Sequence, residues 1–343
     1  MSGRIVAGAT PVRVGIAAAS DVGECRRTAR RLAEGYMFDA DEVGKICIVA
    51  TELATNVLRH GGGGEVLVQM LDDGANPQLE MLAIDRGRGM RDVALCLRDG
   101  YSTGGTLGTG LGAVARLSSL FDVFSVPERG TVVLSRISRG GTRASSAAGE
   151  RVEFGAVCVT LAGEIECGDT WRIADAGDRC ALLVADGLGH GALAATAARD
   201  SALTFAARPF DAPAELLAAM HERLLGKRGA VAACAQLHLE EARVDYAGVG
   251  NIHGSIVGRE SSRGLVSHHG TLGFTWARPR QFAYDWPAGD LLIMHSDGLS
   301  SRWNLAHLRG LHALHPALIA AVLYRDLGRA RDDATVVVVR RRA

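Results

Sequence analysis

Leu182–Gly191 reads Leu-Leu-Val-Ala-Asp-Gly-Leu-Gly-His-Gly, an apolar run that ends at Asp186 and is followed by three glycines within five residues. The apolar run predicts a buried strand. The glycines allow a sharp turn and a close approach of the backbone to a ligand. A carboxylate therefore stands at a strand end beside a carbonyl that no Cβ screens, which suits a hard divalent cation. The stretch also fits a plain strand and turn in which Asp186 caps a helix from Ala192.

Three further stretches place acidic residues at strand edges in the same manner. They are Cys167-Gly168-Asp169-Thr170, His295-Ser296-Asp297-Gly298 and Arg331-Asp332-Asp333-Ala334. Carboxylates gathered in this way repel one another unless cations lie between them. Two octahedral metal ions, bridged by a carboxylate and a water, would remove that repulsion. The pattern therefore predicts a two-metal site.

In their order along the chain, the motifs Gly-Asp, Asp-Gly-x-Gly-His-Gly, Ser-Asp-Gly and Asp-Asp-Ala resemble the PPM family of metal-dependent Ser/Thr protein phosphatases. The nearest branch is the SpoIIE/RsbX-like one, and the resemblance runs from Arg151 to the C-terminus. It implies an α-β-β-α sandwich, two Mn2+ or Mg2+ ions, and a bridging water that attacks phosphoserine, with Asp186 central to catalysis. The implied metal-binding residues are Asp169, Asp186, Gly187 through its carbonyl, Asp297 and Asp333. His190 is either a helper of the leaving group or a structural residue.

The composition limits the classes of protein and partner. The chain has 343 residues, enough for about two domains. Lys+Arg and Asp+Glu both number 38, so no charge excess points to nucleic acid or an anionic membrane. The seven cysteines form no Cys-x-x-Cys pair and are expected to be reduced. We see neither a signal-peptide pattern nor an apolar run approaching ~18 residues, and so expect a soluble cytoplasmic protein.

The N-terminal half contains a predicted helix with two polar residues on one face. Asp39 is its expected cap, and it is expected to end at His60-Gly61-Gly62-Gly63-Gly64. Glu52 and Asn56 lie four residues apart and therefore share a face. The apolar positions step by three and four, as on a helix buried along one side; they are Val43, Ile46, Ala50, Leu53 and Val57.

Two glycine-rich stretches follow this helix. A predicted strand over 79–84 runs into Asp85-Arg86-Gly87-Arg88-Gly89, and Gly108-Thr109-Gly110-Leu111-Gly112 opens a predicted helix over 113–120. Glycines at a helix start offer free backbone N–H groups and the positive end of the helix dipole. The second stretch therefore favours a phosphate-binding site.

Together, Glu-Leu-x-x-Asn, Asp-x-Gly-x-Gly and Gly-x-Gly-x-Gly resemble the N, G1 and G2 boxes of the GHKL ATPase/kinase superfamily over residues 10–138. The resemblance is strongest to RsbT/RsbW-type serine-protein kinases, and it implies a Bergerat-type α/β sandwich that binds ATP with Mg2+. It implies that Glu52 polarises the attacking hydroxyl, Asn56 holds Mg2+ and Asp85 bonds the adenine amine. The other implied nucleotide-binding residues are Gly87, Gly89, Gly108, Gly110, Gly112 and Thr131.

These interpretations divide an α+β chain into a GHKL-like domain over 10–138, a Gly-, Ser- and Ala-rich linker over 139–150, and a PPM-like domain over 151–343. The leading hypothesis is a bifunctional partner-switching regulator that phosphorylates and dephosphorylates a serine of a STAS-type signalling protein, on family resemblance. Two alternatives stay open: a phosphatase with a non-catalytic ATP-sensing domain, and an anti-sigma-like ATP-dependent binding module. The sequence leaves a homodimeric assembly open as well.

Overall fold

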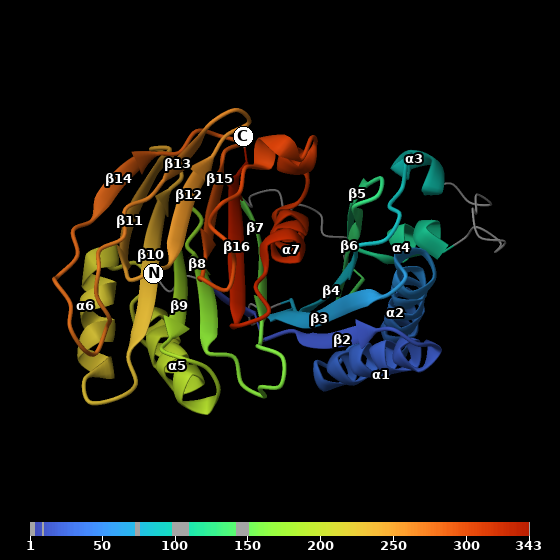
Figure 1. The fold of residues 1–343 in the computed structure, drawn as a ribbon, viewed down its shortest axis with the longest axis horizontal. Coiled ribbons are helices and arrows are strands. Elements are labelled where there is room, and N and C mark those ends of the chain that lie inside the picture. Colours follow the sequence, from blue (N-terminus) through green and yellow to red (C-terminus); the bar gives the residue numbers. More distant parts are fainter. Residues whose placement is uncertain (1–3, 9, 73–75, 98–109, 142–150, 343) are drawn as a thin grey trace. The chain divides into compact units, whose positions relative to one another are not determined.

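The computed structural model of the chain, drawn in Figure 1, describes residues 4–8, 10–72, 76–97, 110–141 and 151–342. The chain divides into an N-terminal unit, Pro11–Ala148, and a C-terminal unit, which consists of Gly149–Ala343 together with Met1–Thr10. Each unit contains both helices and sheets, as the sequence predicts.

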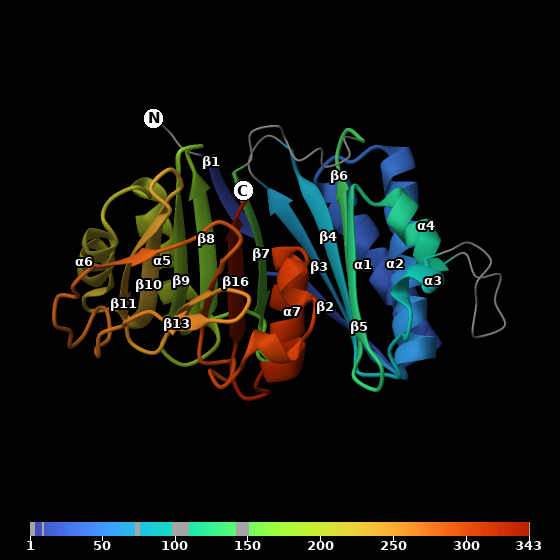
Figure 2. The ribbon, with the colours of Figure 1, turned by 90° about the horizontal axis from the view of Figure 1, so that it is seen from above.

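The N-terminal unit is an antiparallel sheet with helices on one face. The strand order is β2-β3-β4-β6-β5. Figures 1 and 2 show α1, α2 and α4 on the same face of this sheet. The strands are β2 Val12–Ile16, β3 Gly64–Asp72, β4 Gln78–Asp85, β5 Leu120–Val126 and β6 Gly130–Ser138. The helices are α1 Ala19–Gly35, α2 Ala40–Gly61, the single turn α3 Val93–Cys96, and α4 Gly110–Leu117.

Helix α2 has well-defined signals at both ends. The Asp39 carboxylate accepts the Glu42 N–H at 2.8 Å, and the Glu42 carboxylate accepts the Asp39 N–H at 2.9 Å. This reciprocal pair satisfies backbone donors that the first helical turn leaves free. At the other end Gly62 has φ +69°, the left-handed conformation that closes a helix most readily on glycine. The predicted start and end of this helix agree with its bounds.

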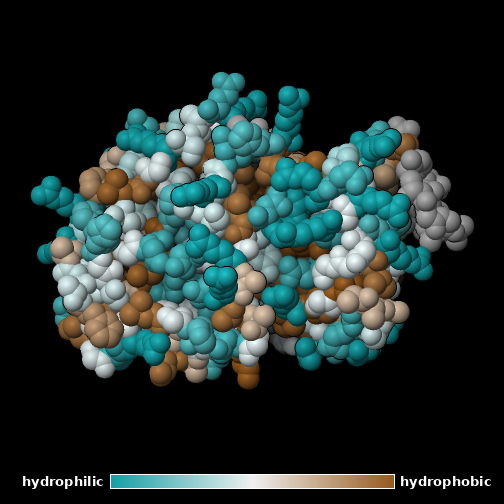
Figure 3. Space-filling view, viewed as in Figure 1, coloured by the Kyte–Doolittle hydropathy of each residue, from teal (hydrophilic) through white to brown (hydrophobic). Residues whose placement is uncertain are grey.

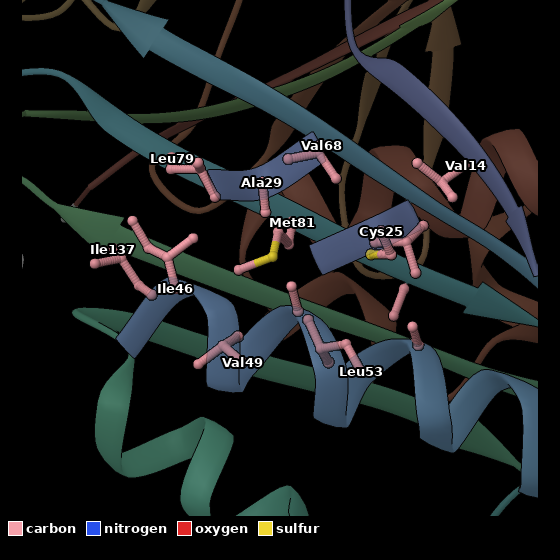
Figure 4. Close-up of a cluster of buried hydrophobic side chains, with 14 of the residues drawn as sticks. Val14, Cys25, Ala29, Ile46, Val49, Leu53, Val68, Leu79, Met81 and Ile137 are labelled. Atoms are coloured by element: carbon pink, nitrogen blue, oxygen red, sulfur yellow. The ribbon is translucent and has the colours of Figure 1, made fainter. Parts of the chain in front are cut away.

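The core of the N-terminal unit lies between its helices and its sheet (Figure 4). Ile46, Val49 and Leu53 project from α2 onto Leu79 and Met81 of β4. All five side chains are fully buried. Because burying a side chain of this size stabilises a fold by about 1.5–3 kcal/mol, this face fixes the position of α2. Glu52 and Asn56 are carried on the same helix.

The C-terminal unit is a sandwich of two antiparallel sheets with helices outside. One sheet has the order β14-β11-β10-β9-β8-β1 and the other β13-β12-β15-β16-β7. Helices α5 Ala192–Ala207 and α6 Pro213–Leu224 pack on the first sheet, and α7 Pro316–Leu327 packs on the second (Figure 1). The first sheet consists of β1 Arg4–Gly8, β8 Asp169–Asp175, β9 Arg179–Gly187, β10 Ala230–His238, β11 Arg243–Val249 and β14 Phe282–Asp285. The second consists of β7 Val152–Val159, β12 His253–Val257, β13 Ser262–Gly264, β15 Leu291–His295 and β16 Ala334–Arg341.

Strand β1 is a feature that the sequence did not predict. It pairs antiparallel with β8, with Ile5 opposite Ala174 and Val6 opposite Ile173. Ile5 also packs against the core beneath α5 and α6. The start of the chain therefore belongs to the C-terminal unit, although the rest of that unit begins only after residue 148.

The surface is mixed in hydropathy. On the face seen in Figure 3, hydrophilic side chains are interspersed with smaller apolar groups. Among the described residues, no helix is both long enough and apolar enough to cross a membrane.

Candidate active sites

The first candidate site lies at one end of the C-terminal sandwich, where β8 begins and β9 ends. Antiparallel pairing places Asp169 directly opposite Asp186. The Gly187 N–H donates to the Gly168 carbonyl at 2.9 Å, which holds the two strand ends together. A Cβ on Gly187 would lie 2.2 Å from the Ala194 carbonyl oxygen. The first turn of α5 can therefore pack against the end of β9 only because residue 187 is a glycine.

Asp297 joins this site from the other sheet. It follows β15, and its carboxylate accepts the Asn251 side-chain amide at 2.7 Å. Ser296, one residue earlier, donates its hydroxyl to the Asp169 carboxylate at 2.6 Å. The same hydroxyl accepts the Thr335 N–H at 3.0 Å. The predicted motifs around Asp169, Asp186 and Asp297 are therefore brought together by hydrogen bonds and strand pairing.

The electrostatics of these carboxylates shows an excess of negative charge. Burial raises the pKa of Asp169, Asp186 and Asp297, and neighbouring carboxylates raise each pKa further. Asp186 makes no side-chain hydrogen bond or ion pair with any described residue. Buried and half-buried carboxylates that repel one another are a donor set that fits divalent cations. No three His, Cys, Asp or Glu side chains of the described ranges are already gathered as ligands of one ion, so the carboxylates would have to close around it.

Asp333 has surroundings that differ from those predicted for a metal ligand. Its carboxylate is 2% exposed and accepts two backbone N–H groups, from Leu161 at 2.6 Å and from Gly168 at 2.7 Å. Both oxygens are thus already bonded to the segment that leads into Asp169. This geometry gives Asp333 a positioning role, because it fixes the 161–168 loop against β16.

Asp332 is the residue that the sequence reasoning missed. It is half-buried, and its charge raises the pKa of Asp297, Asp186 and Asp169. One of its oxygens accepts the Asp333 N–H at 2.9 Å. Asp333 also raises the pKa of Asp169 and Asp186, so Asp332 differs from it mainly in accepting one backbone N–H of the described residues where Asp333 accepts two. The signal was present in the Asp-Asp pair, but the sequence does not indicate which of the two faces the site.

His190 lies at the rim of this site, with its side chain 57% exposed. Its Nδ1 is 2.5 Å from a Glu164 carboxylate oxygen. Arg228 stabilises the same turn, since its Nε donates to the Leu188 carbonyl at 2.7 Å. The paired, exposed position of His190 favours orientation of the turn over proton transfer.

The second candidate site lies in the N-terminal unit around Asp85, at the end of β4. The buried Asp85 carboxylate accepts the N–H of Gly87 at 2.8 Å and of Thr131 at 3.2 Å. A Cβ on Gly87 would lie 2.5 Å from both the Gly61 Cα and the His60 carbonyl oxygen. Gly89 has φ +63° and, given a Cβ, would meet the Val126 carbonyl oxygen at 2.2 Å. The two glycines are thus required by close packing around Asp85.

Thr131 is tied to the same group of residues. Its hydroxyl lies 2.9 Å from that of Ser125, which also accepts the Met90 N–H at 2.8 Å. Asp85 and Thr131, each predicted to bind the nucleotide, are therefore joined by a direct backbone-to-carboxylate bond.

Helices α2 and α4 bring together the other predicted residues of this site. A Cβ on Gly110 would lie 2.6 Å from a Glu52 carboxylate oxygen and 3.9 Å from the Asn56 side-chain oxygen. Glu52 and Asn56 are both half-buried on the α2 face that meets the start of α4. Gly112 is buried one turn into α4. Gly108 lies outside the described residues.

Family models match both units of the chain. Residues 16–136 match the histidine kinase-like ATPase domain, and residues 176–342 match stage II sporulation protein E (SpoIIE). The serine/threonine-protein kinase RsbT of Bacillus subtilis is 32% identical over 113 residues, which is 33% of this chain and 85% of RsbT.

Solved structures agree with the sandwich fold. One, from work on the bacterial stressosome as a modular system adapted to control secondary messenger signalling, is 30% identical. It covers 56% of this chain and 100% of its own, with a TM-score of 0.52. The crystal structure of RsbX in complex with magnesium is 20% identical, covers 56% of this chain and 96% of its own, and has a TM-score of 0.51. The expected fold class, an ATPase-like domain followed by a phosphatase-type sandwich, is confirmed.

Proposed function

This chain belongs to the family of the serine/threonine-protein kinase RsbT through its ATPase-like domain, and we propose that it phosphorylates and dephosphorylates the same partner protein. In this proposal the N-terminal unit transfers phosphate from ATP to a serine, and the SpoIIE-type unit removes it. One observation supports the phosphatase half of the proposal: Asp169 and Asp186 lie opposite each other on paired strands, and Asp297 and Asp332 are near enough to raise the pKa of Asp186, an acidic site of the kind that divalent cations occupy in a metal-dependent phosphatase.

The metal-binding residues proposed here differ from the predicted ones at one position, with Asp332 in place of Asp333. Asp169, Asp186, the Gly187 carbonyl, Asp297 and Asp332 would bind Mn2+ or Mg2+. When bound, such ions would lower the pKa of a coordinated water, so that it could act as a nucleophile on a phosphate ester at neutral pH. Ser296 orients Asp169, and Asp333 holds the loop that precedes it.

In the N-terminal unit, ATP with Mg2+ would lie between the Asp85 region and the start of α4. Asp85 would accept the adenine amine, and Thr131 would support it. Asn56 would bind Mg2+, which bridges the phosphates and neutralises their charge. Glu52, beside Gly110, would accept the hydroxyl proton of the partner's serine.

The proposed partner is a STAS-type signalling protein. The similarity to RsbT and to a stressosome structure that is 30% identical supports this class. The support is by association, because nothing in the fold itself selects a partner. A homodimer and a cytoplasmic location are parts of the same proposal.

The phosphatase half is tested with p-nitrophenyl phosphate and a phosphoserine peptide. Hydrolysis should require added Mn2+ or Mg2+, and Asp186→Ala should abolish it while leaving the circular-dichroism spectrum unchanged. Full activity in excess EDTA would contradict the two-metal assignment.

The nucleotide half is tested by calorimetry with ATP and Mg2+. Asp85→Asn should weaken binding roughly ten- to a hundredfold, because a charge-assisted hydrogen bond contributes about 1.5–3 kcal/mol. No ATP binding by the folded chain would exclude both a kinase and an ATP sensor.

A further inference from the structure

Arg329 is held at the mouth of the aspartate cluster by two hydrogen bonds to one turn. Its backbone N–H donates to the Gly298 carbonyl at 2.7 Å. Its Nη1 donates to the Asp297 carbonyl at 3.1 Å. The guanidinium is therefore fixed beside Asp297 although the residue itself is exposed.

Arg329 forms no ion pair with a carboxylate of the described residues. Its contact with Asp297 goes to the backbone carbonyl, while the Asp297 carboxylate is bonded by Asn251. By contrast, Arg223 on α6 forms an ion pair with Asp200 at 2.9 Å. Arg329 lies close enough to lower the pKa of Asp297 through its charge. It is thus a positioned cation with most of its N–H donors still open.

Open N–H donors of this kind suit a phosphoryl group. A guanidinium presents its donors in a planar fork that matches two oxygens of a phosphate, and such charge-assisted bonds are stronger than neutral ones. A phosphate ester bound at the cluster would lie near the guanidinium, since the guanidinium is anchored to the turn that carries Asp297. The aspartates themselves repel phosphate unless cations intervene.

We propose that Arg329 binds the phosphoryl group of the substrate at the aspartate cluster. The inference rests on the proposed phosphatase function, and it names the residue that selects a phosphate over an uncharged ester. Arg329 binds and orients the phosphoryl oxygens; it exchanges no proton with the substrate, because a guanidinium stays charged.

The direct test is equilibrium dialysis of the full chain against radiolabelled inorganic phosphate at saturating Mg2+. Arg329→Ala should raise the dissociation constant about ten- to a hundredfold. Arg329→Gln keeps an amide donor for the Asp297 carbonyl but has no charge, and should bind phosphate as poorly as the alanine variant. Arg329→Lys keeps the charge without the fork and should recover part of the affinity. Arg223→Ala, the matched control, should bind like the wild type.

A purely structural role would change metal binding instead. For that reason, the Mn2+ concentration that half-saturates p-nitrophenyl phosphate hydrolysis is measured on the same variants. The proposal expects KM to rise with the Mn2+ requirement unchanged. Normal phosphate binding by Arg329→Gln, or a Mn2+ requirement that rises with the loss of affinity, overturns it.

The dialysis also separates this inference from the proposed function. If the wild type binds phosphate through Arg329 but hydrolyses nothing, the phosphatase assignment fails and the anion site stands. If the wild type hydrolyses esters and Arg329→Gln binds phosphate normally, only the inference fails.

Discussion

Asp332 and Asp333 are adjacent carboxylates with different surroundings, and the difference decides how the aspartate cluster works. Asp333 is buried and accepts two backbone N–H groups, whereas Asp332 is half-buried and accepts one, and both raise the pKa of Asp186. The roles follow from register: Asp333 directly precedes β16 and points into the sandwich. The metal-binding role therefore depends on which of the two carboxylates keeps an oxygen available for a metal ion.

Paired substitutions test this division. Asp332→Asn should raise the Mn2+ concentration for half-maximal phosphatase activity at least about tenfold, with little change in stability, since a polar substitution at a half-buried position outside the apolar core is nearly neutral. Asp333→Asn leaves one buried N–H without an acceptor and should lower the free energy of unfolding by about 1–3 kcal/mol. Urea denaturation and Mn2+ titration measure both. The opposite pattern would return the metal-binding role to Asp333.

The residue patterns of the sequence predicted part of this site. Asp186 and Asp297 are recognisable because each ends an apolar run and is followed by glycine. The metal-binding role of Asp333 stays a prediction; its two backbone hydrogen bonds favour Asp332 instead, and an Asp-Asp pair contains no signal for which member faces inward. The anchoring of Arg329 was also hidden, since it depends on a contact with Asp297, 32 residues away in the chain.

At the scale of elements, the contact between α2 and α4 positions the proposed base. Gly110→Ala should preserve the fold, because alanine favours a helix, but its Cβ would displace the Glu52 carboxylate. We expect ATP affinity to change little and phosphate transfer to fall by about tenfold or more, as a misplaced base loses part of its ~100- to 10,000-fold contribution. Calorimetry and radiolabel transfer distinguish the two effects. Unchanged transfer would show that Glu52 does not act at this position.

The paired strands β12 and β15 carry a pH-dependent contribution to stability. Burial lowers the pKa of His295 to about 4, and burial also lowers that of His253, which lies opposite it. His295 Nδ1 donates to the Ser296 carbonyl at 2.8 Å, and its Nε2 accepts from Trp303 at 3.3 Å, so the folded state keeps the ring neutral. Below an unfolded pKa of about 6.5 the unfolded chain gains a proton that the folded chain does not.

The stability of the folded chain should therefore fall as pH drops from about 6.5 towards 4, by up to ~1.4 kcal/mol per pH unit for this histidine. Urea midpoints of the wild type and of His295→Gln, recorded between pH 7.5 and 5, give the histidine contribution as their difference. A difference that is the same at every pH would contradict the assignment.

Elements were predictable where their signals are local. Helix α2 carries its own cap at Asp39 and its own stop at Gly62, so its bounds follow from the sequence. Strand β1 is only five residues long, and its partner β8 begins at residue 169. Such a distant pairing leaves no periodic signal in five residues, which explains why the strand was not predicted.

In the proposed function, one whole molecule contains two opposing phosphate transfers. With both units active, a partner protein would be phosphorylated and dephosphorylated repeatedly, and ATP would be consumed without net labelling. ATP consumption in the presence of partner and Mn2+ should therefore fall steeply in either Glu52→Ala or Asp186→Ala. Consumption that is independent of Asp186 would mean that the units do not act on the same phosphoprotein.

The most direct measurement is transfer of label from radioactive ATP to a serine of a STAS-domain protein in the full chain carrying Asp186→Ala. That background removes the proposed phosphatase, so product accumulates. We expect the serine to be labelled. The labelling should disappear when Glu52→Ala is added, and wild-type protein with Mn2+ should remove the label. If no STAS protein is labelled, yet ATP changes the rate of phosphoserine hydrolysis by the wild type, the N-terminal unit is a sensor and the central claim is wrong.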